Sequence, residues 1–194
     1  MRDGLFFHGY GLHSLIDYTV LVVSPYLLYS DLKIVKMKWI KRFLILALLV
    51  LIVLQLVRPD KNDQGYDSLK AFIADTNPTD NVSTILKTSC YDCHTNQTTY
   101  PWYANVAPVS YWLDEHIEHG KGHLNFSEWG SYSKKRKDHK LEEFIEIIEE
   151  KEMPLPSYTW IHKDAILDEA QIKELLQWAQ LARVKYSAAT NVPQ

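Results

Sequence analysis

The most constraining feature of the sequence is an apolar run near its N-terminus, residues 43–57, which reads FLILALLVLIVLQLV with Gln55 as its one polar residue. These 15 residues are fewer than the roughly 20 that cross a bilayer as a helix. Counting from Trp39, with Lys41 and Arg42 extending their charged ends to the interface, brings the segment into range. We therefore expect one membrane-spanning helix, followed by a separate folded domain.

Charged residues are distributed unequally around this run. Four basic residues precede it, namely Lys36, Lys38, Lys41 and Arg42. Lys and Arg are concentrated on the cytoplasmic side of membrane helices, and LQLVRPDKND, which follows, offers no small-residue cleavage site. We expect a protein of the cytoplasmic membrane, with residues 37–60 as a single uncleaved anchor and residues 61–194 as a domain in the periplasm.

Residues 1–36 allow two interpretations. The stretch from Leu12 to Tyr29 is apolar overall but carries His13, Asp17 and Pro25, and it could form a first span that pairs with the anchor as a hairpin. Alternatively, translation starts at Met37, because MKWIKRF resembles the beginning of such an anchor. We favour the second interpretation. Both place the main domain outside the cytoplasmic membrane.

The part of the chain after Val57 has the length of one domain and is mildly acidic, with 15 Lys and Arg against 21 Asp and Glu. No nucleic-acid partner is expected, because no basic patch runs through it. Apolar residues recur at helical spacing, and no alternating strand pattern is visible. We therefore predict an all-α domain, with helices that include Tyr66–Ala74, Val82–Lys87, Val109–His116, Leu141–Ile148 and Ile172–Ala179.

The only two cysteines lie in the segment SCYDCHTNQTTYPW, residues 89–102. Cys90, Cys93 and His94 form C-x-x-C-H, the attachment signature for covalent haem. Positions i, i+3 and i+4 share one face of a helical turn, so two thiols can bond to the two vinyl groups at one porphyrin edge while the imidazole lies beneath the iron. The motif predicts one haem c, attached through Cys90 and Cys93, with His94 as the proximal ligand.

Three other uses of the two cysteines remain open. A thioredoxin-like pair would follow a strand in a βαβ pattern, which is not seen here. A structural disulfide across two residues is strained and closes too short a loop to stabilise much. A zinc site would need two further ligands at finger-like spacing, and the available histidines are His116, His119, His123, His139 and His162.

Met153 is the predicted sixth ligand of the iron. It follows the stripe Leu141–Ile148 and precedes Pro154, which disfavours helical geometry at Met153 and lets its side chain reach inward. A methionine between charged residues and proline is also unusual for a core residue. His116, on the stripe of Val109 and Trp112, is the alternative ligand, with His162 behind it and an open iron site also possible.

Further residues near the motif have predicted roles. Trp102 and Tyr103 follow it in a loop and are candidates for contact with the haem. The region of Pro108 is the candidate for the carbonyl that orients the His94 ring. Trp112 is expected in the core, His119 and His123 in solvent, and the LNFSEW segment in a helix-capping corner.

Two long segments resemble a known family. CYDCHTNQTTYPWYANVAPVSYWLDEHIEHGKGHLNFSEW and EMPLPSYTWIHKDAILDEAQIKELLQW are similar to the bacterial envelope haem-binding domain family, over roughly residues 58–183. The resemblance implies haem binding in the envelope, a frequent N-terminal anchor, and related domains that occur beside cytochrome c and di-haem peroxidase modules.

The resulting hypothesis is a small cytochrome c-like helical domain wrapped around one covalent haem. It predicts a membrane-anchored mono-haem c-type cytochrome that exchanges electrons with a partner protein of the envelope and is a carrier rather than an enzyme. The alternative is a haem-based sensor or ligand binder with an open or labile sixth site, or a haem module associated with a peroxidase.

Overall fold

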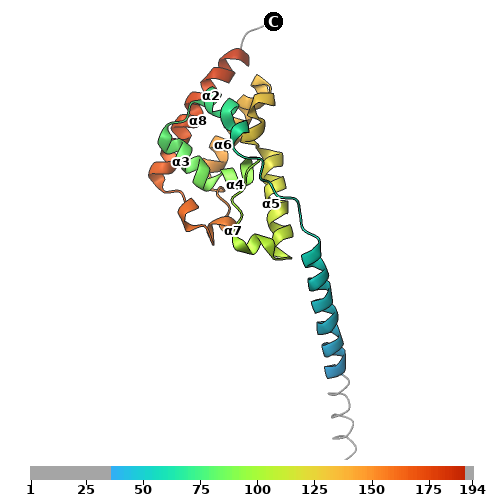
Figure 1. The fold of residues 1–194 in the computed structure, drawn as a ribbon. Helices are drawn as coiled ribbons and strands as arrows, with labels where there is room; N and C mark the ends of the chain where they lie inside the picture. The colour runs from blue at the N-terminus through green and yellow to red at the C-terminus, as the bar shows by residue number, and fades with distance from the viewer. Residues whose placement is uncertain (1–35, 191–194) are drawn as a thin grey trace, which may run out of the picture. The chain divides into compact units, whose positions relative to one another are not determined.

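The computed structural model describes residues 36–190 of the chain, and it separates into two units at the bond between Leu56 and Val57 (Figure 1). Within residues 36–190 the regular structure is helical, as predicted, and the one β-type contact is an isolated antiparallel bridge between Asp63 and Gln97. The possible first span Leu12–Tyr29 lies outside the described residues.

The first unit contributes a helix of 21 residues, Lys36–Leu56. By length and composition this helix is long and apolar enough to cross a membrane. Nearly all of its side chains are exposed, as expected for a helix whose neighbours are lipids. The predicted apolar helix is therefore present, and it is consistent with an anchor.

The second unit is a helical domain. Its long helices are α5 (Val109–His123), α6 (Lys134–Glu149) and α8 (Glu169–Thr190). Each contains one of the three predicted apolar stripes. The shorter α-helices are α2 (Lys70–Thr76), α3 (Asp80–Ser89), α4 (Tyr91–His94) and α7 (Pro156–Thr159), and the 3-10 turns are η1 (Asp67–Leu69), η2 (Trp102–Asn105), η3 (Phe126–Ser131) and η4 (Lys163–Ala165).

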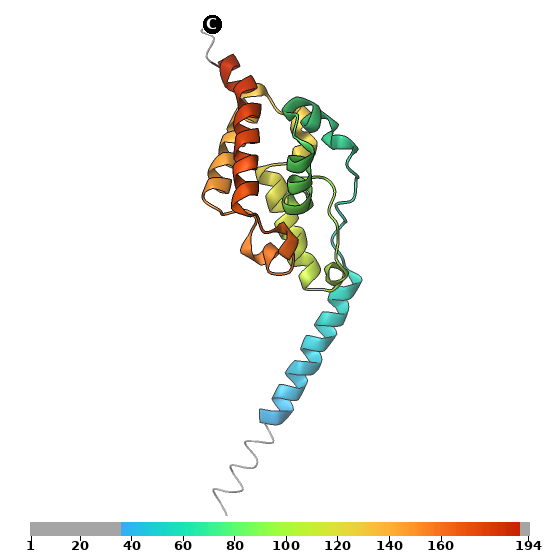
Figure 2. The same cartoon turned by 90° about the vertical axis from the view of Figure 1, so that its left-hand side faces the viewer.

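The helices α6 and α8 run side by side (Figure 2). The core lies between this pair on one side and α2, α3 and the turn η3 on the other. Phe72 of α2 is its aromatic centre, with ring centroids 4.5 Å from Phe126, 5.4 Å from Trp129 and 5.9 Å from Trp178. Burial of each such side chain contributes about 1.5–3 kcal/mol. This packing joins elements from both ends of the domain sequence.

Asp75, at the end of α2, is the polar centre beside this core. Its Oδ2 atom accepts hydrogen bonds from Lys137 Nζ at 2.6 Å and from Trp129 Nε1 at 3.2 Å. Burial alone would raise the pKa of Asp75, but the donated hydrogen bonds and the charge of Lys137 outweigh it and hold the pKa below its usual value of 3.8. The charged carboxylate is therefore the form that the fold stabilises.

We expect Asp75→Asn to lower the free energy of unfolding by about 1–3 kcal/mol at neutral pH, because charge-assisted hydrogen bonds are lost. The folded-state pKa is depressed, so this contribution is present above the usual carboxyl pKa and disappears as the pH falls through the lower folded value. Chemical denaturation as a function of pH should show the two proteins converging in acid. The control is Asp67→Asn, whose carboxylate pairs with Lys70 on the surface and should contribute little.

The helices α4 and α5 pack on each other, and Gly120 lies directly against Cys93. A Cβ atom on Gly120 would lie 2.7 Å from the carbonyl oxygen of Cys93 and 3.2 Å from its Cβ. Only glycine permits this spacing without a shift of the backbone. Gly122, in the same turn of α5, has no atom within 4 Å of the equivalent position.

Gly120→Ala should therefore destabilise the domain by about 1–3 kcal/mol, because the methyl group forces α5 away from α4. Gly122→Ala is the matched control, and it should be neutral or stabilising by up to about 1 kcal/mol, since alanine favours the helix and meets no neighbour. Thermal or denaturant unfolding of both variants measures the difference. Equal changes in the free energy of unfolding for Gly120→Ala and Gly122→Ala would contradict the close packing of α5 on α4 at Gly120.

Candidate haem site

The C-x-x-C-H motif forms a single helical turn. The amide groups of Cys93 and His94 donate to the carbonyl of Cys90 at 3.2 and 3.0 Å, and Cys90 caps the N-terminus of α4. Of the two residues between the cysteines, Tyr91 is buried against Phe126 outside the cavity, whereas Asp92 borders the cavity and bonds to neighbouring loops. Both thiols and the imidazole line the same cavity, which is the arrangement that the spacing predicts.

The imidazole of His94 is held by the end of α5. Its Nδ1 atom lies 2.9 Å from the carbonyl oxygen of Leu124, which leaves Nε2 as the nitrogen for a metal. Burial lowers the pKa of His94 below its usual value, so the neutral ring, the form that binds metals, is favoured. The prediction that the region of Pro108 supplies this carbonyl is wrong, because the Pro108 carbonyl accepts from Tyr111 and Trp112 within α5.

The Leu124 carbonyl is positioned by a buried corner at Asn125. The Asn125 side chain caps η3 by accepting from the Ser127 amide at 3.0 Å, and its Nδ2 donates to Asn96 Oδ1 at 2.8 Å. The Asn125 amide donates to Tyr132 Oη at 3.2 Å. The capping corner predicted for LNFSEW is confirmed, and it also fixes the partner of His94.

The cavity beside the motif has a volume of about 930 Å³, within the range of cofactor sites. One wall consists of α4 and α5, which pack on each other, and another consists of the C-terminal half of α6 with the segment that leads to α7. The lining is mainly apolar, and its aromatic and aliphatic members include Trp112, Leu113, Phe126, Phe144, Ile147 and Ile148. Such walls suit the flat apolar faces of a porphyrin.

Both thiols are protonated near neutral pH. Burial raises the pKa of Cys90 to about 12, with the charge of Cys93 adding to the effect. Burial and then the charge of Asp92 raise the pKa of Cys93 to about 11. Thiol oxidoreductases instead lower a cysteine pKa to activate the thiolate. The electrostatics of the motif therefore disfavour a thioredoxin-like function.

Met153 lines the cavity from the wall formed by α6 and its C-terminal extension. The α6 helix ends before Pro154 is reached. Lys151 adopts a left-handed conformation (φ +58°), and Glu152 N–H donates to the Ile147 carbonyl at 3.0 Å. This helix termination turns the chain back toward the cavity. The expected inward position of Met153 is thus observed, but its cause lies at Lys151 rather than at Pro154.

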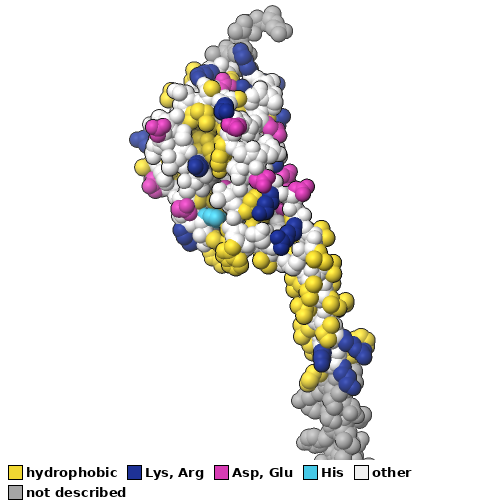
Figure 3. Space-filling model, viewed as in Figure 1, with side chains coloured by type: hydrophobic (Ala, Val, Ile, Leu, Met, Phe, Trp, Pro, Cys, Tyr) yellow, Lys and Arg dark blue, Asp and Glu magenta, His cyan; other side chains and the backbone are white. Residues whose placement is uncertain are grey.

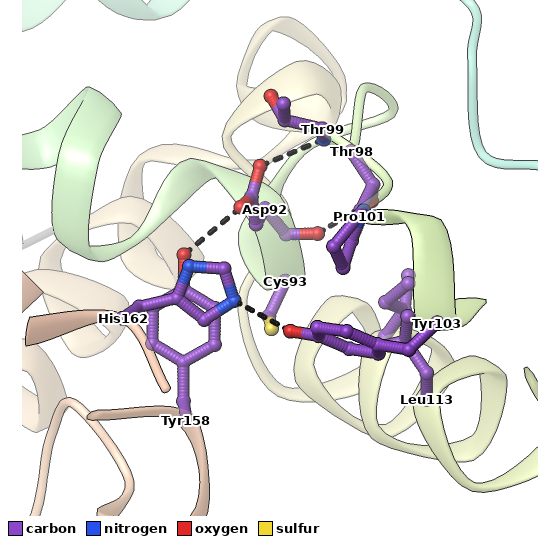
Figure 4. Close-up of a pocket in the computed structure, with 10 residues that line it drawn as sticks. Asp92, Cys93, Thr98, Thr99, Pro101, Tyr103, Leu113, Tyr158 and His162 are labelled. Atoms are coloured by element: carbon purple, nitrogen blue, oxygen red, sulfur yellow. Dashed lines mark hydrogen bonds between the residues drawn. The ribbon is translucent and has the colours of Figure 1, made fainter. Parts of the chain in front are cut away.

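A polar cluster joins the loops that enclose the motif (Figure 4). Tyr158 Oη of α7 donates to Asp92 Oδ2 at 2.9 Å, and Thr99 N–H donates to Asp92 Oδ1 at 2.9 Å. Tyr103 Oη lies 3.0 Å from His162 Nε2. The bond of Tyr158 ties the segment after Met153 to the motif, and the contact of His162 ties it to the loop after the motif, although 66 and 59 residues separate the partners in sequence.

The remaining predicted site residues divide into two groups. Tyr103, His116 and His162 line the cavity, whereas Trp102 and Pro108 do not. Trp102 is 81% exposed. The placement of Trp112 in the core is also wrong, because its side chain is 46% exposed and borders the cavity.

The other histidines of α5 lie along the rim of the cavity. His119 and His123 are exposed, as predicted, with ring centroids 4.7 Å apart, and both contribute to the lining. Within residues 36–190, no three or more His, Cys, Asp or Glu side chains are grouped so that they could hold a metal ion. The sequence analysis did not identify Gly120, Leu124 or Tyr158, although a glycine inside an apolar helical pattern is itself a signal of close packing.

Comparison with known families identifies one match. The sequence profile described as "Haem-binding domain" matches residues 49–181, more than half of the chain. Neither the curated proteins nor the solved structures that were searched include a match. With a motif that presents two thiols and an oriented imidazole to one apolar cavity, the chain belongs to the haem-binding domain family.

Proposed function

We propose that this haem-binding protein is a membrane-anchored mono-haem c-type cytochrome that transfers electrons outside the cytoplasmic membrane. The observation that carries the proposal is the single cavity that Cys90, Cys93, His94 and Met153 all line. This set contains two attachment groups and two axial donors, the complement of a six-coordinate haem c.

Cys90 and Cys93 would hold the haem through thioether bonds, and His94 Nε2 would bind the iron. The hydrogen bond from His94 Nδ1–H to the Leu124 carbonyl fixes the ring tautomer and raises the basicity of the ligand. The apolar side chains of the cavity walls would contact the porphyrin and limit the access of water to the bound haem. When bound, the haem supplies a one-electron change between ferric and ferrous iron.

Met153 is the sixth ligand in this proposal. The α5 helix, which carries His116, packs on α4 and bonds to the ring of His94, so α5 belongs to the same wall as the proximal ligand. Met153 comes from the wall of α6, and a ligand from a separate wall is better placed for the second axial position. A thioether opposite histidine stabilises ferrous iron and raises the reduction potential, which suits an electron carrier.

The anchor places the domain at the membrane. The helix Lys36–Leu56 has the required length, and its N-terminal end carries the basic residues Lys36, Lys38, Lys41 and Arg42. The tendency of basic residues to stay in the cytoplasm orients the following domain toward the periplasm. Covalent haem attachment outside the cytoplasmic membrane agrees with this orientation.

A second candidate function is a haem-based sensor with a labile sixth site. The observation that favours it is the position of His116 on the lining of the same cavity, with its Nδ1 atom 2.8 Å from the Trp112 carbonyl and Nε2 left for a metal. Two alternative donors beside one iron would permit exchange of ligands. Spectra of the variants below distinguish this function from electron transfer.

Covalent attachment predicts that the full chain, produced with a haem-maturation system, gains the mass of one haem. Cys90→Ala combined with Cys93→Ala should abolish this gain, because no thioether can form. Intact-mass spectrometry after acid–acetone extraction measures the retained haem. Met153→Ala is the control, since it leaves both thiols in place and should keep the haem; retention by the double cysteine variant would refute the attachment.

Ligation by Met153 predicts a weak band of the ferric protein near the red end of the visible spectrum. Met153→Ala should remove this band, admit CO to the ferrous protein and lower the reduction potential, because the thioether is lost. His116→Ala is the matched control and should leave the band unchanged. Loss of the band in His116→Ala, with Met153→Ala unaffected, would transfer the assignment to His116.

A further inference from the structure

Two tryptophans have the most exposed aromatic side chains of residues 57–186. Trp102, in η2, is 81% exposed, and Trp160, just after α7, is 77% exposed. Neither lines the cavity. Water contact of two large apolar side chains is unfavourable, and exposed apolar patches mark surfaces that contact a partner or a membrane.

These two tryptophans belong to one end of the domain. The segments that carry them are joined by the hydrogen bond between Tyr103 and His162. Figure 3 shows hydrophobic side chains gathered at the end where α5 begins and α7 lies. Other exposed apolar residues of these segments are Val106 and Ile166, while Val109, Leu155 and Ile161 are also exposed but line the cavity.

The chain also enters the domain at this end. Tyr111 Oη, in the first turn of α5, donates to the carbonyl of Val57. The Asn62 amide donates to Tyr100 Oη at 2.8 Å, two residues before Trp102, and Lys61 lies over the Tyr100 ring at 5.5 Å. Leu56, the last residue of the apolar helix, is bonded directly to Val57. The tether between a spanning helix and this surface is therefore only a few residues long.

We propose that Trp102 and Trp160 insert into the interface of the lipid bilayer, so that the domain rests on the membrane through this end. The inference depends on the anchor assigned under the proposed function. Tryptophan is enriched at membrane–water interfaces, where its ring is partly buried and its N–H group remains hydrated. The neighbouring charges are of both signs, as in Arg58, Asp60 and Lys163, so the attraction rests on apolar contact and requires no anionic lipid.

The test is hydroxyl-radical footprinting of the full, haem-loaded chain, with one chain in each phosphatidylcholine nanodisc. Leu181→Trp provides the internal reference, because Leu181 is 73% exposed on α8 and is absent from the apolar patch. Peptide mass spectrometry should show Trp102 and Trp160 oxidised several-fold more slowly than the indole introduced at position 181. Trp102→Ser with Trp160→Ser should in turn increase labelling of Val106 and Ile166, neither of which lines the haem cavity.

Similar oxidation of all three indoles would overturn the inference and leave this surface free for a protein partner. Failure of the proposed function is distinguishable, because a chain without an anchor does not enter nanodiscs and a chain without haem lacks the added mass. If the chain is inserted and carries haem but both tryptophans are oxidised as fast as the reference indole, the membrane contact is refuted and the proposed function is not. Raising the salt concentration should not weaken the protection, since the contact is apolar.

Discussion

The close contact between α4 and α5 is the constraint on which the rest of the site depends. Gly120 lets the two backbones approach so closely that a methyl group would meet the Cys93 carbonyl. The same approach brings the end of α5 to His94, whose ring is held by the Leu124 carbonyl. The orientation of the imidazole and one wall of the cavity thus both depend on this contact.

Different helices form the core and the cavity wall of the domain, which explains why the two lie side by side. The α6 and α8 helices bury their apolar faces against each other and against Phe72, Trp129 and Trp178. The α5 helix is different, because Ile117 is buried whereas Trp112 and Val109 remain partly exposed beside the cavity. The apolar stripe of α5 therefore lines the cavity more than it packs in the core.

The sequence predicted the helical class, the positions of the long helices and the grouping of Cys90, Cys93 and His94, because helical periodicity and motif spacing are local properties. It misplaced Trp112, since periodicity shows that a face is apolar but not whether side chains or a cofactor cover it. The acceptor for His94 was also misassigned, because Leu124 lies 30 residues away and its position depends on the corner at Asn125. Met153 lines the cavity, as its predicted inward position requires, but the reason given was partly wrong, because the turn at Lys151 depends on backbone conformation.

The corner at Asn125 has a consequence for the dynamics of the site. The last turns of α5 contain two glycines, which weaken the helix locally and favour transient opening. The carbonyl that orients His94 lies just beyond them, yet it is followed by an asparagine that is 1% exposed and bonded on three sides. Fluctuations of the helix end are therefore limited at the His94 ring by this buried corner, in which Asn125 bonds to Asn96 and Tyr132.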